Sequence, residues 1–298
     1  MRRYDVIHFN MGRTILPPLV TSKGSSSQRF PSLLHDAYGV YARALGMRDL
    51  TLLHRMGKGI FVTFQGGDAR QGLFSTQRGD IVKRKVIAAF DRYADGIFYL
   101  NPDLARFLPP RAQFLPYAHL DLQEWRPPPP NGRDTGKPVL LHAPSDRAQK
   151  GTRYVLDAVE TLRREGIDFE FLLVEGVPRQ EARPLYERAD ILVEQFVAGW
   201  YGALAVELMA LGKPVVGHID EQDLRVVPEG MRADLPIIRA TGDSLADVLR
   251  QYLTLPVKAL AELGVRCRTY VESWHDPIQI ARQLRREYET AMEGKRAS

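Results

Sequence analysis

Residues 189–217 have the sequence ADILVEQFVAGWYGALAVELMALGKPVVG, and this stretch decides how the surrounding chain folds. Its apolar run 191–193 predicts a buried parallel strand. A loop with two glycines follows, and the run 203–211 has the composition of a helix that ends at Gly212. Residues 213–216 then begin another strand. The stretch therefore predicts one strand–helix–strand unit of a parallel sheet.

A loop that leads from a strand into the N-terminus of a helix can bind an anion. The first backbone N–H groups of the helix have no partners there, and the helix dipole is positive. Glu207 lies about one turn inside this helix, and its Cα–Cβ bond tilts back toward the helix N-terminus. A carboxylate repels phosphate but accepts hydrogen bonds from sugar hydroxyls. The stretch therefore predicts a nucleotide-sugar site, with the phosphates on the loop and helix and the ribose on Glu207.

The composition is that of a globular protein with substantial cores. Of the 298 residues 44% are apolar, and the length is typical of two domains. The net charge of +5 is mild and spread along the chain; it fits an acidic substrate or a nearby anionic membrane surface, and it favours a solvated surface over either. Cys267 is the only cysteine, so an intrachain disulfide and a cysteine metal cluster are excluded. The sequence shows no apolar run of about 18 residues and no secretory segment, so we expect a cytoplasmic protein.

Predicted strands alternate with predicted helices on both sides of a proline-rich segment. The strands are 4–9, 59–64, 97–100 and 113–116 in the first half, and 138–142, 169–174, 190–193 and 213–216 in the second. This alternation is typical of parallel sheets with right-handed crossovers. Pro127–Pro130, followed by turn-forming residues, marks a linker. We therefore predict a domain at 1–126, a linker at 127–137, a second domain at 138–274 and a C-terminal helical segment, 275–298, that packs back toward the first domain.

Short motifs along the chain resemble, in their order, those of the GT-B glycosyltransferases of family 4. In the second half they are His142–Ser145, Lys150–Thr152, Tyr186–Asp190 and the run from Gly202 through Glu207 to Val216. In the first half they are Thr63–Arg70 and Phe114–Tyr117, with Asp121 and Trp125. The resemblance covers most of the chain and is most specific in the second half, where the spacing between the lysine–glycine element and the helix also agrees.

This resemblance implies an α/β fold of the GT-B class, in which two Rossmann-like domains with parallel sheets face each other across a cleft. The first predicted domain would be the acceptor side, in a shortened form without the first βα unit of the family. The second would bind the nucleotide sugar. The implied activity is retaining, metal-independent hexosyl transfer from a nucleotide-diphosphate sugar to a saccharide or lipid-linked acceptor, in polysaccharide or glycoconjugate synthesis.

The implied co-substrate is a nucleotide-diphosphate sugar of UDP or GDP type, and neither a resident cofactor nor a metal is expected. No nucleic-acid partner is expected. The resemblance leaves the sugar, the base, the acceptor and the oligomeric state open. Peripheral contact with the inner face of the membrane is a further expectation, in keeping with the mild positive charge.

Carried over residue by residue, the resemblance assigns roles on the donor side. Lys150 would contact the diphosphate, which fits its place before a glycine–threonine helix start, and Arg147 would share that role. Glu207 would hold the ribose. The other residues assigned to the donor are Gly151, Glu175, Gly202, Ala203 and Leu204, the last three through backbone N–H groups. Fixed N–H donors and a lysine can stabilise a leaving diphosphate without Mg²⁺.

The residues assigned to the catalytic side are Asp68, Gln65 and Gly199, and two of them depart from the family pattern. Gln65 stands where the family often has a histidine. Gly199 stands where the first glutamate of a pair, the one that faces the transferred sugar, is expected. Glu194 is nearby but does not fit the spacing. Asp68 has two interpretations: a polar contact to a sugar, or the cap of its own loop.

These departures keep a second interpretation open, a non-catalytic nucleotide-sugar-binding or partner subunit with a degenerate GT-B fold. A more distant alternative is a GT-B epimerase or phosphorylase. His142 ends a predicted buried strand, and a histidine in that position is more often structural than functional.

Overall fold

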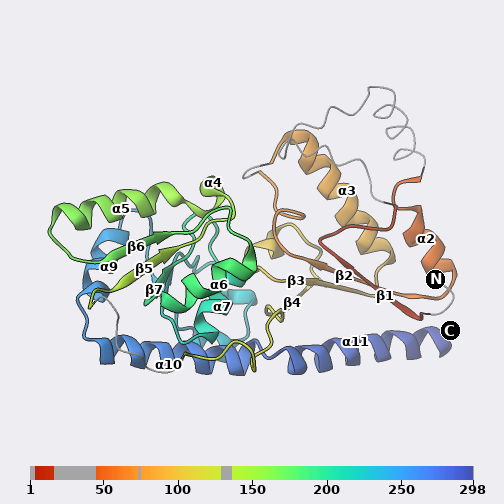
Figure 1. Cartoon of the computed structure of the whole chain (residues 1–298). Helices are drawn as coiled ribbons and strands as arrows, with labels where there is room; N and C mark the ends of the chain where they lie inside the picture. The colour runs from red at the N-terminus through yellow and green to blue at the C-terminus, as the bar shows by residue number, and fades with distance from the viewer. Residues whose placement is uncertain (1–3, 17–44, 73–74, 129–135, 298) are drawn as a thin grey trace. The chain divides into compact units, whose positions relative to one another are not determined.

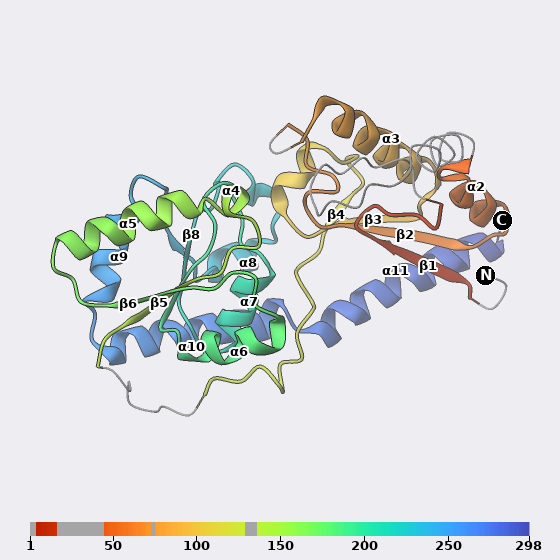
Figure 2. The same cartoon turned by 45° about the horizontal axis from the view of Figure 1, so that its top comes forward.

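The computed structural model of the protein describes residues 4–16, 45–72, 75–128 and 136–297. The chain forms two compact units. Unit 1 comprises Met1–Leu115 and Ala281–Ser298, and unit 2 comprises Pro116–Ile280. Each unit consists of a parallel sheet with helices against its faces (Figures 1 and 2). In the described parts of the chain, no helix combines the length and the apolar character needed to cross a lipid bilayer.

In the described residues, unit 1 is built on a four-stranded parallel sheet with the order β1-β2-β3-β4. The strands are β1 (Val6–Asn10), β2 (Gly59–Phe64), β3 (Gly96–Tyr99) and β4 (Gln113–Phe114). Every residue of β2 and β3 is buried, which explains why both are nearly continuous apolar runs. Asn10 lies opposite Thr63 and Phe64 opposite Tyr99, so the C-terminal ends of these parallel strands lie at one edge of the sheet.

Helices cover both faces of the unit 1 sheet (Figures 1 and 2). One face carries α2 (Arg48–Arg55) and α3 (Gln77–Tyr93). The other face carries α11 (Pro277–Ala297), from Ala281 onward. The short helix η1 (Pro102–Arg106) follows β3. Phe90 of α3 packs on Phe9, with ring centroids 5.6 Å apart. On the other face, the ring of Tyr288 lies 4.6 Å from that of Phe61, and its hydroxyl lies 2.5 Å from His8 Nδ1.

In its described part, unit 2 has a five-stranded parallel sheet with the order β6-β5-β7-β8-β9. The strands are β5 (Val139–His142), β6 (Glu170–Leu173), β7 (Ile191–Val193), β8 (Val215–Gly217) and β9 (Ile238–Arg239). The chain runs from β5 outward to β6 and returns to β7 on the other side of β5. Leu140 of β5 lies opposite Ile191 of β7. This reversal of direction is the point at which open α/β sheets bind ligands.

Helices also cover both faces of the unit 2 sheet (Figures 1 and 2). One face carries α5 (Thr152–Arg164) and α9 (Leu245–Leu253), and the other carries α6 (Arg179–Arg188), α7 (Ala203–Ala210) and α10 (Val257–Trp274). The short helices are α4 (Arg147–Lys150), η2 (Leu224–Val226) and α8 (Glu229–Asp234). Val155, Val159 and Leu162 form the buried stripe of α5 and share one core cluster with Leu245 and Leu249 of α9.

Most of these elements lie close to their predicted positions. The predicted strand 190–193 contains β7, and the predicted helix 203–211 contains α7. The short elements α4, α8 and β9 are absent from the prediction, because elements of two to six residues are too short to show a periodic pattern. Of the predicted linker 127–137, residues 129–135 lie outside the described residues. The chain divides between Leu115 and Pro116, so the segment that follows this point belongs to unit 2.

Candidate functional site

A cavity of about 390 Å³ lies at the carboxyl end of the unit 2 sheet. Its walls come from the loops after β5 and β6, from α6 and from the start of α7. The lining residues are Ala143, Pro144, Ser145, Val174, Gly176, Val177, Tyr186, Ala203, Leu204 and Glu207, with His119 from the segment before β5. A mostly apolar wall with a few polar groups is the usual lining of a small-molecule site.

The N-terminus of α7 forms one side of this cavity. Gly202 is the N-cap residue and has no side chain to cap the helix, so the N–H groups of Ala203 and Leu204 have no partner within the helix. Glu207 is the one charged residue of α7, and it is 7% exposed. His119 Nε2 lies 3.5 Å from Glu207 Oε1. An anion-binding helix end and a carboxylate one turn further along therefore face the same space.

Lys150 reaches the N-terminus of α7 from the turn between α4 and α5. Gly151 makes this turn with a φ of 72°, a conformation that favours glycine. Lys150 Nζ lies 2.5 Å from Glu194 Oε1. A Cβ atom added to Gly202 would lie 3.2 Å from both of these atoms. The ion pair therefore packs directly against the N-cap of α7.

Glu194 follows β7 immediately, and its side chain is only 1% exposed. Oε1 accepts a hydrogen bond from Lys150, whereas Oε2 is buried and has no hydrogen-bond partner among the described residues. A buried carboxylate oxygen without a donor costs free energy of folding. Such a group in a folded protein needs a functional or structural explanation.

Arg147 and Glu175 bind each other at the surface of unit 2. Arg147 Nε donates to Glu175 Oε1 at 2.7 Å, and Nη2 donates to Oε2 at 2.5 Å. This two-point contact raises the pKa of Arg147 and lowers the pKa of Glu175. Both side chains were predicted to face the donor, and in this structure they satisfy each other.

His142 has a structural role that accounts for both of its ring nitrogens. It is 1% exposed, Nδ1 donates to the carbonyl oxygen of Val193 at 2.8 Å, and Nε2 accepts from the Thr152 hydroxyl at 2.9 Å. Burial lowers its pKa, which keeps the ring neutral. His142 therefore ties β5 to β7 and to the start of α5.

Gly199 lies in a loop that is packed tightly against the residues after β8. A Cβ added to Gly199 would lie 2.3 Å from Cβ of Asp220, and the Asp220 N–H donates to the Gly199 carbonyl oxygen at 3.0 Å. Trp200 and Tyr201 follow, are both buried and stack with ring centroids 4.4 Å apart. With this backbone no side chain fits at position 199, so a glutamate could not stand there.

Asp68 and Gln65 lie in unit 1, in the loop after β2. Asp68 Oδ1 accepts from the N–H groups of Gln65 at 3.0 Å and of Gly66 at 2.7 Å. The Gln65 carbonyl oxygen accepts from Asn101 Nδ2. Burial raises the pKa of Asp68, and these backbone hydrogen bonds oppose that rise. The carboxylate of Asp68 caps its own loop, the second of its two predicted interpretations.

Two residues of the site, His119 and Glu194, are missing from the predicted set. Glu194 directly follows a buried parallel strand, a position at which functional residues of α/β sheets are common, and that signal could have identified it. His119 comes from a segment without helical or strand periodicity, and no sequence pattern indicates its contact with Glu207. In the described parts of the chain, no group of three or more His, Cys, Asp or Glu side chains is arranged to hold a metal ion.

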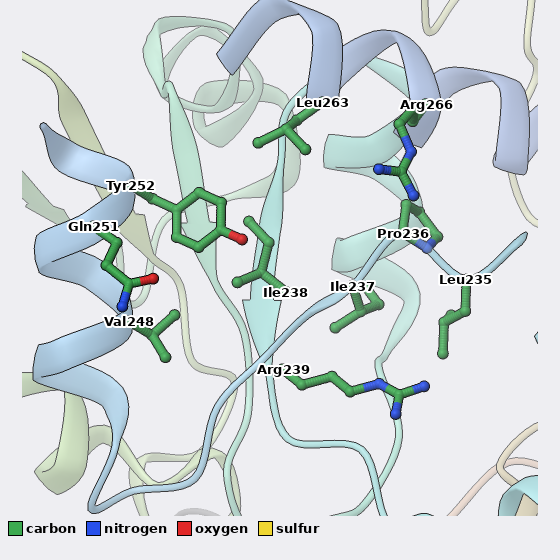
Figure 3. A pocket seen from close by; sticks show the side chains of 10 residues that line it. All are labelled: Leu235, Pro236, Ile237, Ile238, Arg239, Val248, Gln251, Tyr252, Leu263 and Arg266. Carbon is green, nitrogen blue, oxygen red and sulfur yellow. The ribbon is translucent and has the colours of Figure 1, made fainter. Parts of the chain in front are cut away.

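A second cavity, of about 400 Å³, lies at the edge strand β9 (Figure 3). Gln251 and Tyr252 line it from α9, and Leu263 and Arg266 line it from α10. The described residues that line it include no carboxylate and none of the predicted site residues. Its described lining therefore offers no carboxylate that could accept hydrogen bonds from two ribose hydroxyls, as Glu207 does in the proposed site.

No protein-family model matches the chain, and no curated protein matches it. Solved structures do match. A sucrose-phosphate synthase from Thermosynechococcus elongatus has 15% identity and a TM-score of 0.61, over 98% of this chain and 75% of that one. HepE from Anabaena, in complex with UDP-glucose, has 13% identity and a TM-score of 0.57, over 82% and 77%.

A glycosyltransferase from Rickettsia africae has 10% identity and a TM-score of 0.56, over 91% of this chain and 84% of that one. At these identities the likeness concerns the fold. The chain therefore has the α/β GT-B fold with two parallel sheets, which confirms the predicted fold class.

Proposed function

We propose that the protein is a glycosyltransferase of the family 4 type, which transfers a hexose from a nucleotide-diphosphate sugar to a saccharide or lipid-linked acceptor. The observation that carries the proposal is the convergence of Lys150, the N-terminus of α7 and Glu207 within unit 2. The GT-B fold supports it, because several proteins of this fold are glycosyltransferases and HepE was solved with UDP-glucose.

In this proposal the diphosphate of the donor lies at the N-terminus of α7. The N–H groups of Ala203 and Leu204 point to the phosphates, the helix dipole attracts them, and Lys150 supplies a positive charge. Glu207 accepts hydrogen bonds from the ribose, beside His119. The apolar walls of the cavity take the base of a UDP- or GDP-type donor, and about 390 Å³ is within the range of small-molecule sites.

Sugar transfer breaks the bond between the anomeric carbon and a diphosphate oxygen, so negative charge grows on the leaving diphosphate. Fixed N–H donors and Lys150 stabilise that charge without having to reorganise. We therefore propose a reaction that needs neither a bound metal nor a resident cofactor. The resemblance of the sequence motifs supports retention of configuration and an acceptor from polysaccharide or glycoconjugate synthesis. We also propose a cytoplasmic setting, in keeping with the lack of an apolar run of about 18 residues, and contact with the inner face of the membrane, in keeping with the mild positive charge.

Titration calorimetry with UDP-, GDP- and ADP-sugars tests donor binding. We expect one nucleotide class to bind, and we expect Lys150→Ala and Glu207→Ala each to lower its affinity by about ten-fold or more, since each removes a charged hydrogen-bonding group. Matched controls are Lys137→Ala and Glu165→Ala, which remove surface ion-pair partners of Asp168 and Arg250 in the same unit. Unchanged affinity in both site variants, or no binding to the wild type, would refute the proposal.

A second candidate is a non-catalytic nucleotide-sugar-binding subunit. Two observations favour it: Gly199 has no room for a side chain, and Asp68 caps its own loop. Donor hydrolysis and transfer over a panel of saccharide and lipid-linked acceptors separate the two candidates. Turnover that is lost in Lys150→Ala supports the transferase, whereas donor binding without any turnover supports the binding subunit.

A further inference from the structure

A buried carboxylate already neutralises the lysine that would meet the donor diphosphate. Lys150 Nζ is 2.5 Å from Glu194 Oε1, and both atoms lie against Gly202 at the N-cap of α7. The N-terminus of a helix attracts anions, so a protein carboxylate there competes with a phosphate for the same positive potential. A site built only for tight anion binding would leave the charge of Lys150 uncompensated.

The negative charge of Glu194 is held in place by the sheet. Its backbone N–H donates to the carbonyl oxygen of Val216 at 2.8 Å, which ties it to β8, and its side chain is 1% exposed. Lys150, by contrast, has a long side chain that is 17% exposed and comes from a turn. When a ligand draws Lys150 Nζ toward its phosphates, Glu194 stays where it is. The ligand therefore meets a lysine together with a fixed carboxylate.

A nucleoside diphosphate and its sugar ester differ in charge at one end of the molecule. The terminal phosphate of the free nucleotide has a second ionisation near pH 6, so at pH 8 it carries about one more negative charge than the sugar ester. We place this terminal phosphate next to Lys150, because the ribose is proposed to lie on Glu207 and the diphosphate then extends from it toward Gly202 and Lys150 Nζ. A fixed carboxylate beside it repels the free nucleotide more strongly than the donor.

We propose, on the basis of the proposed function, that Glu194 is a positioning residue that also sets the charge of the site. It holds Lys150 Nζ against Gly202, and it lowers the affinity for the free nucleoside diphosphate relative to the nucleotide sugar. The leaving product then dissociates more readily after transfer. The buried Oε2 without a partner is the cost of keeping this charge at the site.

The test compares two ligands on three forms of the full chain at pH 8. Titration calorimetry measures the dissociation constants of UDP and UDP-glucose, or of GDP and GDP-mannose if the protein binds that class. Glu194→Gln keeps the size and the hydrogen bond to Lys150 but removes the charge. We expect it to bind the free nucleotide roughly ten-fold and the sugar ester roughly three-fold more tightly, because the phosphate beside position 194 carries about two negative charges in the free nucleotide and about one in the ester.

Glu194→Asp keeps the charge, so we expect the ratio of the two constants to stay within about two-fold of the wild-type ratio, even where the shorter side chain weakens both. The matched control is Glu165→Gln, which removes a carboxylate paired with Arg250 at the far end of α5, about 20 Å along the helix from Lys150. It should leave the ratio unchanged.

If Glu194→Gln changes the two dissociation constants by the same factor, Glu194 only positions Lys150. This result would overturn the inference, while the proposed function would stand. A wild type that binds no nucleotide would overturn the proposed function itself, and the inference with it. A ratio that shifts in Glu194→Gln and is retained in Glu194→Asp supports both.

Discussion

At two positions before α7, Gly199 and Gly202, glycine is favoured because neighbouring atoms lie close to where a Cβ atom would be, and not because of the backbone conformation. Neither Gly199 nor Gly202 has a positive φ. A Cβ on Gly199 would lie 2.3 Å from Cβ of Asp220, and one on Gly202 would lie 3.2 Å from Lys150 Nζ. A side chain at position 199 would therefore clash with a packed residue, whereas a side chain at position 202 would contact the end of a long side chain that can move.

Gly199→Ala should destabilise unit 2, because the new methyl group has no space beside Asp220. We expect a loss of about 1–3 kcal/mol in the free energy of unfolding, the usual cost of overpacking. Urea unfolding followed by tryptophan fluorescence measures it, since the three tryptophans, Trp125, Trp200 and Trp274, all lie in unit 2. Gly202→Ala serves as the comparison and should lose less. Equal stability of Gly199→Ala and the wild type would contradict the packing described for this loop.

His275 makes the stability of unit 2 depend on pH. It is 1% exposed, Nδ1 donates to the carbonyl oxygen of Tyr117 at 2.8 Å, and Nε2 accepts from the Tyr201 hydroxyl at 2.9 Å. Burial lowers its pKa from 6.5 to about 4. Between these values the unfolded chain takes up a proton that the folded chain does not, so the contribution of His275 is complete above pH 6.5 and is lost as the pH falls toward 4.

The expected loss through His275 is about 2 kcal/mol between pH 7 and pH 5. His275→Gln removes this titration, so the stability of the variant should fall less steeply over the same range, whatever its stability at pH 7. Urea unfolding by tryptophan fluorescence at several pH values measures both slopes. Identical slopes for the variant and the wild type would show that His275 is not buried in its neutral form.

The sequence predicted the position of some side chains of the site but not the contacts of others. Lys150 and Glu207 stand in local motifs, a lysine–glycine turn and a helix start, and the structure brings both to the N-terminus of α7. The position of Glu194 directly after a strand is visible in the sequence, but its ion pair with Lys150 is not, and neither is the contact of His119 with Glu207. Local pattern cannot reveal such contacts, because they join segments far apart in the chain.

The contact between α7 and α10 shows how two elements constrain each other through their backbones. A Cβ added to Gly264 of α10 would lie 2.1 Å from the carbonyl oxygen of Gly212, directly after α7. Gly212 follows Leu211, the C-cap residue of α7, and its φ of 69° is a left-handed backbone conformation that favours glycine at a helix end. The sequence predicts this helix end at Gly212, whereas the role of Gly264 appears only when the two helices are placed together.

Alanine at Gly264 and at Gly294 should have opposite effects. Gly264→Ala forces α10 away from Gly212, and we expect it to lower stability by at least about 2 kcal/mol despite the better helix propensity of alanine. Gly294 of α11 has no atom within 4 Å of an added Cβ, so Gly294→Ala should gain up to about 1 kcal/mol. Urea unfolding followed by circular dichroism measures both, because the helices of both units contribute to this signal whereas all three tryptophans lie in unit 2. Similar effects at the two positions would contradict the contact between α7 and α10.

At the scale of the whole molecule, the fold class follows from the alternation of strands and helices. Buried runs such as β2 and β7 are continuous apolar segments, and the long amphipathic helices between them leave few alternatives to parallel sheets. The order β6-β5-β7-β8-β9 could not be predicted in this way, because any right-handed crossover satisfies the same pattern. That order is what creates the switch point at which the cavity lies.

The proposed function requires that a nucleotide binds at the carboxyl end of the unit 2 sheet and not in the cavity at β9. Photolabelling with 5-azido-UDP-glucose, and with 8-azido-GDP-mannose in parallel, followed by peptide mapping, tests where the base lies. We expect labelled peptides that contain Val174, Val177 or Tyr186, and loss of the label when excess UDP or GDP is present. Competed labelling at Tyr252 or Leu263 instead would place the nucleotide at β9 and contradict the proposed site.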